Sequence, residues 1–259
     1  MQVSYEVSES AWDKVAKDYY QEVISPLKHS SNKPIQNFLH NFQTQKKSAI
    51  DVGCGTGGLL EYITPRFKNI LAVDISQNML NQALENMQKA HPENHQHIQF
   101  KKKNMIYLGA NEGQFDFVFA INSLINGKYT DLKRSFRNIP KLMKRSSHFV
   151  GVFPALESIQ KEFRQTYESH LKRYQSERMA MAKTKKELEA ERIESMLGLY
   201  NTDDMIQKYY TYYELKELLE EAGLKVLQLD KVEYDKEHSY NYGEKAYSTM
   251  WDWFVVAKK

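Results

Sequence analysis

The feature that most constrains the fold is a glycine-rich segment at residues 51–58, which reads DVGCGTGG. The residues before it, 48–53, are short and mostly apolar, which predicts a buried strand. Glycine lacks a Cβ atom, so it is favoured where the backbone turns tightly or approaches a ligand closely. Residues 57–67 then have a helical pattern. The segment therefore predicts a strand, a tight turn and a helix, with a ligand at the turn.

Strand and helix patterns alternate along most of the chain, which predicts a parallel sheet covered by helices on both faces. No helix fits between the last two strands, so these two are expected to be antiparallel. The predicted fold class is α/β, with a mostly parallel seven-stranded sheet and an antiparallel last strand. The expected strands are 48–53, 69–75, 97–104, 115–122, 148–153, 224–234 and 250–257, and the expected helices are 10–24, 57–67, one capped by Ser76, 131–144 and 212–222.

The alternation stops after the fifth strand. Residues 156–194 form a long, highly charged stretch with helical periodicity and one narrow apolar stripe. We interpret residues 155–205 as a helical insertion within a single domain that spans residues 1–259. A solvated helix, a lid and an oligomer contact are all compatible with this pattern. The stripe favours packing against a partner, and it consists of Ile159, Phe163, Tyr167, Leu171 and Tyr174.

Two acidic residues flank the glycines and help to identify the ligand. Gly53, Gly55 and Gly58 also fit GxGxxG, a pattern typical of dinucleotide binding, so the glycines alone are ambiguous. Asp51 lies near the end of the first strand, where a carboxylate suits a cationic amine and would repel a pyrophosphate. Asp74 ends the second strand, where a carboxylate can accept hydrogen bonds from ribose hydroxyls. The acidic pair therefore favours S-adenosylmethionine over NAD.

Three motifs together resemble the class I S-adenosylmethionine-dependent methyltransferases, which have a Rossmann-like fold. The motifs are DVGCGTG, then VDIS with ML and Ala83 downstream, then FDFVFAINS. The N-terminal WDKVAKDYY is similar to the capping helix that many members carry, and it lies in residues 1–34. The resemblance implies a Rossmann-like core, S-adenosylmethionine as cofactor and in-line methyl transfer to an acceptor.

The resemblance also implies a role for each matching residue. Asp51, Gly53 and Gly55 would line the methionine part of the cofactor. Asp74 would hold the ribose, and Ile75 would lie against the adenine. Asn104 and the backbone of Met105 would meet the adenine edge, although many members have aspartate where Asn104 stands. Asn122 would lie near the methionine part or the acceptor. The implied set of cofactor-binding residues is Tyr19, Asp51, Gly53, Gly55, Asp74, Ile75, Met79, Asn104, Met105 and Asn122.

An amine or hydroxyl acceptor can require a base to take its proton. The segment 234–249 is rich in tyrosine and leaves the ligand-binding edge of the sheet, which makes His238 and Tyr242 the candidate catalytic residues. A packed aromatic loop without a catalytic role is an equally good interpretation of this segment. The fourth strand is followed by INSLI and not by [DN]PP[YF], which disfavours the members that methylate adenine or glutamine amide nitrogens.

Charge and composition bear on the partners. The chain has 36 basic and 33 acidic residues, a net charge of +3, so a nucleic-acid substrate is not expected. A small-molecule acceptor is favoured, and a macromolecular substrate or a non-catalytic binding module remain alternatives. No metal site is expected, since His91, His95 and His97 lack further ligands nearby. One cysteine, no signal sequence and no apolar run of about 20 residues predict a cytoplasmic protein without a membrane span.

Overall fold

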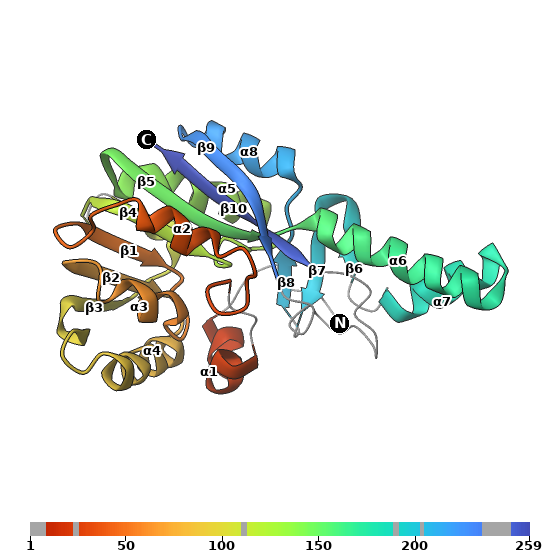
Figure 1. Cartoon of the computed structure of the whole chain (residues 1–259), viewed down its shortest axis with the longest axis horizontal. Coiled ribbons are helices and arrows are strands. Elements are labelled where there is room, and N and C mark those ends of the chain that lie inside the picture. The colour runs from red at the N-terminus through yellow and green to blue at the C-terminus, as the bar shows by residue number, and fades with distance from the viewer. Residues whose placement is uncertain (1–8, 23–25, 110–112, 189–191, 203–204, 235–249) are drawn as a thin grey trace.

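The computed structural model describes residues 9–22, 26–109, 113–188, 192–202, 205–234 and 250–259. Its centre is a seven-stranded sheet with the order β3–β2–β1–β4–β5–β10–β9 (Figure 1). The first five strands in this order run parallel, whereas β10 is antiparallel to both β5 and β9. The predicted fold class is thereby confirmed. The strands are β1 (Ser48–Val52), β2 (Asn69–Asp74), β3 (Ile98–Lys102), β4 (Phe115–Ile121), β5 (Met143–Pro154), β9 (Lys225–Glu233) and β10 (Trp251–Lys258).

Helices cover both faces of this sheet, because each face carries its own buried hydrophobic cluster. One cluster joins the sheet to α5 and α8 through residues such as Phe136 and Leu215. The other joins it to α2, α3 and α4 through Ile35, Leu60 and Leu80. Helix α1 packs against α4 at the edge of the second layer (Figure 1). The bounds are α1 (Glu9–Glu22), α2 (Pro34–His40), α3 (Gly58–Ile63), α4 (Gln77–Ala90), α5 (Tyr129–Asn138) and α8 (Tyr212–Glu221).

The predicted helix 131–144 ends earlier than expected. Helix α5 stops at Asn138, a short 3-10 turn covers Ile139–Leu142, and β5 begins at Met143. The physical reason is Pro140, which has no N–H to donate and whose ring collides with the preceding turn of an α-helix. The fifth strand is consequently longer than the predicted 148–153 at its amino end.

The insertion after β5 is only partly helical, which corrects the sequence prediction. Helices α6 (Leu156–Tyr174) and α7 (Glu177–Leu188) form a hairpin that extends away from the main sheet (Figure 1). The chain then forms a small antiparallel sheet of β6 (Arg192–Glu194), β7 (Leu199–Thr202) and β8 (Met205–Lys208). These strands are too short for their alternation to stand out in the sequence. Pairing with distant residues stabilises them, because the backbone N–H of Lys208 donates to the carbonyl of Ile125.

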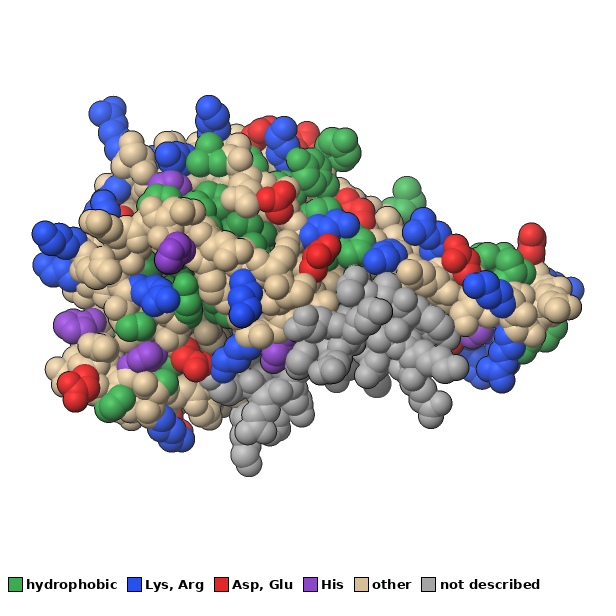
Figure 2. Space-filling view, in the orientation of Figure 1, with side chains coloured by type: hydrophobic (Ala, Val, Ile, Leu, Met, Phe, Trp, Pro, Cys, Tyr) green, Lys and Arg blue, Asp and Glu red, His purple; other side chains and the backbone are tan. Residues whose placement is uncertain are grey.

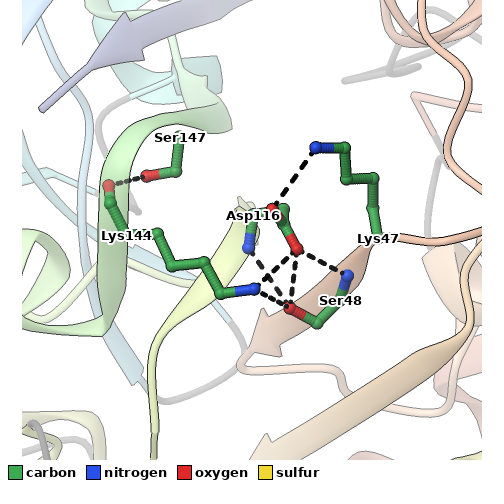
Figure 3. Close-up of polar contacts among 5 residues, drawn as sticks. All are labelled: Lys47, Ser48, Asp116, Lys144 and Ser147. Carbon is green, nitrogen blue, oxygen red and sulfur yellow. Dashed lines mark hydrogen bonds and ion pairs between the residues drawn. The ribbon is translucent and has the colours of Figure 1, made fainter.

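A cluster of charged side chains links the amino ends of β1, β4 and β5 through hydrogen bonds and ion pairs (Figure 3). Asp116 accepts hydrogen bonds from Lys144 Nζ at 2.8 Å and from Ser48 N at 2.9 Å, and Lys47 Nζ lies 3.6 Å away. Partial burial alone would raise the pKa of Asp116, but the hydrogen bonds from Lys144 and Ser48 lower it to about 2. The cluster lies at the edge of the sheet opposite to the carboxyl ends of the parallel strands, so its role is structural.

We expect Asp116→Asn to lower the free energy of unfolding by about 1 kcal/mol at pH 7, because the exchange removes a partly exposed ion pair. The folded-state pKa of Asp116 is depressed, so its contribution is present above pH 4 and is lost as the pH falls toward 2. Urea denaturation from pH 7 to pH 3 should therefore show the gap between the two proteins narrowing below pH 4. Asp230→Asn, at an exposed carboxylate on β9, is the matched control. An equal gap at every pH would contradict the prediction.

Candidate functional site

A pocket opens at the carboxyl ends of β1, β2 and β4, where ligands bind in open α/β sheets. It brings together residues from six separate parts of the chain, from α1 to the loop after β4. Nine of the ten residues predicted to bind the cofactor line it: Asp51, Gly53, Gly55, Asp74, Ile75, Met79, Asn104, Met105 and Asn122.

Three glycines shape the turn between β1 and α3. Gly53, Gly55 and Gly57 have φ angles of 72°, 52° and 91°, a region that side chains other than glycine rarely adopt. A Cβ atom on Gly53 would lie 2.4 Å from Cβ of Ser123, whose hydroxyl donates to the carbonyl of Val52. The loop after β4 therefore packs directly against the glycine turn.

Gly58 behaves differently, and this resolves the ambiguity of the glycine pattern. It begins α3 without a positive φ, and an added Cβ would have no atom within 4 Å. In a dinucleotide-binding turn the third glycine is needed for close packing of the helix on the strand. No such packing exists at Gly58, so the glycines that the turn requires do not follow the dinucleotide spacing.

Asp74 connects the glycine turn to the start of α4. Its Oδ2 accepts from the Gly55 N–H and its Oδ1 from the Ser76 N–H, both at 2.9 Å. Burial raises the pKa of Asp74, and these backbone hydrogen bonds partly offset that rise. Ser76 caps α4 as predicted, since its hydroxyl accepts from Met79 N at 3.0 Å. The backbone N–H of Ile75 also hydrogen-bonds to this carboxylate, and a carboxylate has about four lone-pair sites, so a site remains for a hydroxyl donor.

The N-terminal helix reaches this same point. Ser76 also donates its hydroxyl to Asp13 of α1, and the backbone N–H of Asn78 lies 3.2 Å from the same carboxylate oxygen. Trp12, next to Asp13, lines the pocket. Helix α1 is therefore bound to the start of α4 through side chains, and it forms one wall of the site.

Asp51 is the most unusual group in the pocket. Its side chain is 1% exposed, and its Oδ2 has no hydrogen-bond partner among the described residues. Burial, and then the nearby Asp74, raise the pKa of Asp51 to about 8. A buried carboxylate without a partner is costly, and a cationic donor would remove that cost. The donor set thus fits a ligand that brings an amine to Asp51 and hydroxyls to Asp74.

Asn104 lies in the pocket, but part of its hydrogen-bonding capacity is already used. Its Oδ1 accepts from Ile106 N at 3.0 Å and caps the 3-10 turn Met105–Tyr107. Asn138 holds the same turn from α5 by donating to the carbonyls of Met105 and Ile106. The predicted contact of Asn104 with an adenine edge would therefore depend on its amide N–H groups or on the backbone of Met105.

Asn122 follows β4 in a left-handed conformation, with φ of 49°. Its Nδ2 donates to Asp252 Oδ2 at 3.1 Å, and the hydroxyl of Tyr234 donates to the same oxygen at 2.5 Å. The Oδ1 of Asn122 is buried and has no partner among the described residues. The sequence analysis missed Asp252, and it placed Tyr234 at this edge only as the first residue of the segment 234–249. One signal was available, because the start of an antiparallel last strand must lie at the same edge of the sheet as the ends of the parallel strands.

The small sheet of the insertion supports the loop after β4. Ile125 and Asn126 of this loop line the pocket, and Asn126 forms a β-bridge with Gln207 of β8. A Cβ atom on Gly127 would lie 2.7 Å from Ile206, so the loop and the sheet are in close contact. The part of the insertion that adjoins the site is thus β8, and the helical hairpin extends outward from it (Figure 1).

Three predicted residues are not placed. Tyr19 belongs to α1, but its side chain lies outside the described part of the structure. His238 and Tyr242 fall in residues 235–249, which also lie outside the described residues, so the two catalytic candidates stay predictions. The pocket in turn contains residues that the sequence analysis did not single out: Trp12, Pro26, Leu27, Lys28, His29, Thr56, Leu59, Lys103, Ser123, Ile125 and Asn126.

Comparison with known proteins agrees with this geometry. Residues 49–146 match the model of a methyltransferase domain family. No curated protein sequence matches the chain. No helix among the described residues has the length and apolar character needed to cross a membrane.

Solved structures share the fold at low sequence identity. An S-adenosylmethionine-dependent methyltransferase from Mesorhizobium loti is 16% identical, with a TM-score of 0.60 over 90% of this chain and 100% of its own. One from Methanosarcina mazei is 17% identical, with a TM-score of 0.60 over 86% and 96%. Magnesium protoporphyrin IX methyltransferase from Synechocystis PCC 6803, with bound S-adenosylhomocysteine, is 13% identical, with a TM-score of 0.54 over 97% and 82%.

Proposed function

We propose that this chain is a class I S-adenosylmethionine-dependent methyltransferase that transfers the methyl group to a small-molecule acceptor, a proposal that the methyltransferase domain match over residues 49–146 and the shared fold support. S-Adenosylmethionine supplies an electrophilic methyl group on a sulfonium. The acceptor's lone pair forms a bond to the methyl carbon while the carbon–sulfur bond breaks, and its electron pair returns to sulfur. An amine or hydroxyl acceptor also loses a proton. The protein aligns the two partners and excludes water.

The proposal assigns the cofactor to the acidic half of the pocket. Asp51 holds the methionine amine, and Asp74 holds the ribose hydroxyls through the lone pairs that its backbone partners leave free. Asp51 Oδ2 supports this assignment most directly, because it is buried without a partner and gains one from the amine. The remaining predicted residues Tyr19, Ile75, Met79, Asn104 and Met105 would surround the adenosine.

The observation that carries the small-molecule proposal is the composition of the remaining pocket wall. Leu27, Ile121 and Ile125 are apolar, and Asn122, Ser123 and Asn126 are polar without charge. Lys28, His29 and Lys103 also line the pocket, and Lys28 forms an ion pair with Glu61 at 2.9 Å. A concave wall with few charges suits a compact acceptor. Polyanion binding requires clustered cations, whereas acidic and basic side chains are both present along α6 and α7 (Figure 2).

The test uses the protein with radiolabelled S-adenosylmethionine and three separate substrate pools: a metabolite extract, total RNA and folded or unfolded protein. We expect label in the metabolite pool, with a rate that changes little between 50 and 200 mM salt, on the order of twofold, since few phosphates are neutralised. Heat-treated enzyme and an excess of S-adenosylhomocysteine are the controls. Label confined to RNA or protein, with activity that collapses as salt rises, would overturn the small-molecule proposal.

The general base and the location belong to the same proposal. His238 and Tyr242 remain the candidates for removing the acceptor's proton. A cytoplasmic location agrees with the single cysteine, Cys54, which is buried. Burial raises the pKa of the Cys54 thiol, and the carboxylates of Asp74 and Asp51 raise it further, so it is not a ready nucleophile.

A further inference from the structure

Three side chains from distant parts of the sequence form a partly buried hydrogen-bonded network beside the pocket. Asp252 is the second residue of β10, Tyr234 directly follows β9, and Asn122 directly follows β4. Asp252 Oδ2 accepts hydrogen bonds from the Tyr234 hydroxyl at 2.5 Å and from Asn122 Nδ2 at 3.1 Å. Of these three residues, Asn122 lines the pocket.

This arrangement fixes the direction of the Asn122 amide. Its NH₂ group must face Asp252, because the reversed amide would bring an oxygen against a carboxylate. The opposite end, Oδ1, is then directed away from Asp252, and it is buried without a partner among the described residues. The backbone is equally constrained, since Asn122 N donates to Val152 O at 2.9 Å and φ is 49°. Strained conformations of this kind persist where the surrounding structure holds them, often at functional sites.

We propose that Tyr234 and Asp252 are positioning residues that orient Asn122, so that its Oδ1 accepts a hydrogen bond from the N–H or O–H group that receives the methyl. Such a bond holds the nucleophile's lone pair toward the methyl carbon, which is the alignment that in-line transfer requires. It selects nitrogen and oxygen acceptors that carry a hydrogen. The proposal rests on the methyl transfer described above, but not on the acceptor being a small molecule.

The network also gives the reaction a dependence on pH. Burial raises the pKa of Asp252 to about 6, although the hydrogen bonds from Tyr234, Asn122 and the backbone of Ala155 lower it. Its strand neighbours are Pro154 on β5 and Val232 on β9, so among the described residues Tyr234 is the titratable side chain in contact with it. Protonation removes the negative charge that holds the Asn122 amide. The rate of transfer should therefore fall as the pH drops through 6.

The experiment measures the pH–rate profile with whichever pool the wild type labels, at saturating S-adenosylmethionine so that the pH dependence of binding through Asp51 does not enter the profile. The affinity for S-adenosylhomocysteine is measured by calorimetry. Asp252→Asn should lower the rate about tenfold through misalignment, with an affinity within about twofold of wild type. The pH–rate profile of Asp252→Asn should lack the acid limb, which is the fall in rate as the pH drops through 6. Tyr234→Phe removes one hydrogen bond to the ionised carboxylate, so its acid limb should move to higher pH. Asp230→Asn, on exposed β9 surface, is the control and should match the wild type.

Four other outcomes would overturn the proposal. A wild-type rate and acid limb in Asp252→Asn would show that the carboxylate does not act on transfer. A parallel loss of rate, cofactor affinity and melting temperature would show a structural role alone. If Asp252→Asn does not fold, Tyr234→Phe provides the test. An acid limb at the same pH in Tyr234→Phe as in the wild type would contradict the proposal. A wild type that labels no pool contradicts methyl transfer itself and the proposal with it, whereas label in RNA or protein contradicts only the small-molecule acceptor.

Discussion

Replacing Asp51 with asparagine is expected to weaken S-adenosylhomocysteine binding at pH 8 by about 100-fold, or about 3 kcal/mol, because it leaves a buried amine without its carboxylate. S-Adenosylhomocysteine carries the same amine as the cofactor and is suitable for calorimetry. Asp116→Asn, the same exchange at the opposite edge of the sheet, should leave the affinity unchanged.

The wild type should show a pH dependence that Asp51→Asn lacks. Burial and Asp74 raise the pKa of Asp51 to about 8, so in the ligand-free protein this carboxyl is mostly protonated at pH 7. A ligand ammonium requires the ionised form, so binding should release a proton. The affinity should rise about tenfold from pH 6 to pH 7 and level off above pH 8. Calorimetry in buffers with different ionisation enthalpies measures the number of protons that are released on binding.

Two results would contradict this assignment of Asp51. One is an Asp51→Asn protein that keeps both the affinity and the pH slope of the wild type, which would place the amine elsewhere. The other is tighter binding of NAD than of S-adenosylhomocysteine by the wild type, which would refute the interpretation of the whole glycine turn.

The second large effect is expected for Gly53→Ala, which should lower the free energy of unfolding by about 3 kcal/mol. Part of this cost is the positive φ of 72°, which L-residues adopt at about 1–2 kcal/mol. The rest is overpacking, since the new Cβ would lie 2.4 Å from Cβ of Ser123, a carbon close to the backbone that cannot swing away.

The matched control is Gly58→Ala, five residues further along the chain at the start of α3. Its Cβ would have no atom within 4 Å and its φ is not positive, so its stability should stay within about 0.5 kcal/mol of wild type. Urea denaturation of the two variants and the wild type provides the measurement. Equal stabilities for the two variants would mean that the contact between Gly53 and Ser123 does not constrain the turn.

Local sequence patterns were sufficient for the parts of the site that lie near strand ends. Asp51 and Asp74 lie near the ends of two neighbouring parallel strands, and the glycine turn follows the first of them. The carboxyl ends of parallel strands meet at one edge. Their convergence is therefore a consequence of the strand pattern alone. Ser76 was equally predictable, since a cap acts on the backbone only three residues away. The end of the helix at Asn138 could have been found in the same way, because Pro140 is a local signal.

Only the tertiary structure decided the contacts that cross between elements. Which glycine of the turn is indispensable depends on Ser123, some seventy residues away, and the pattern of glycines carries no information about that neighbour. The pairing of Asn122 with Asp252 spans 130 positions, and the small sheet of the insertion depends on Ile125. The periodicity of apolar residues indicates which face of a helix or strand is buried, but not which distant side chains that face contacts. The sequence by itself therefore determined the main sheet and the acidic part of the pocket around Asp51 and Asp74, whereas packing between distant segments determined the part around Asn122 and the loop after β4.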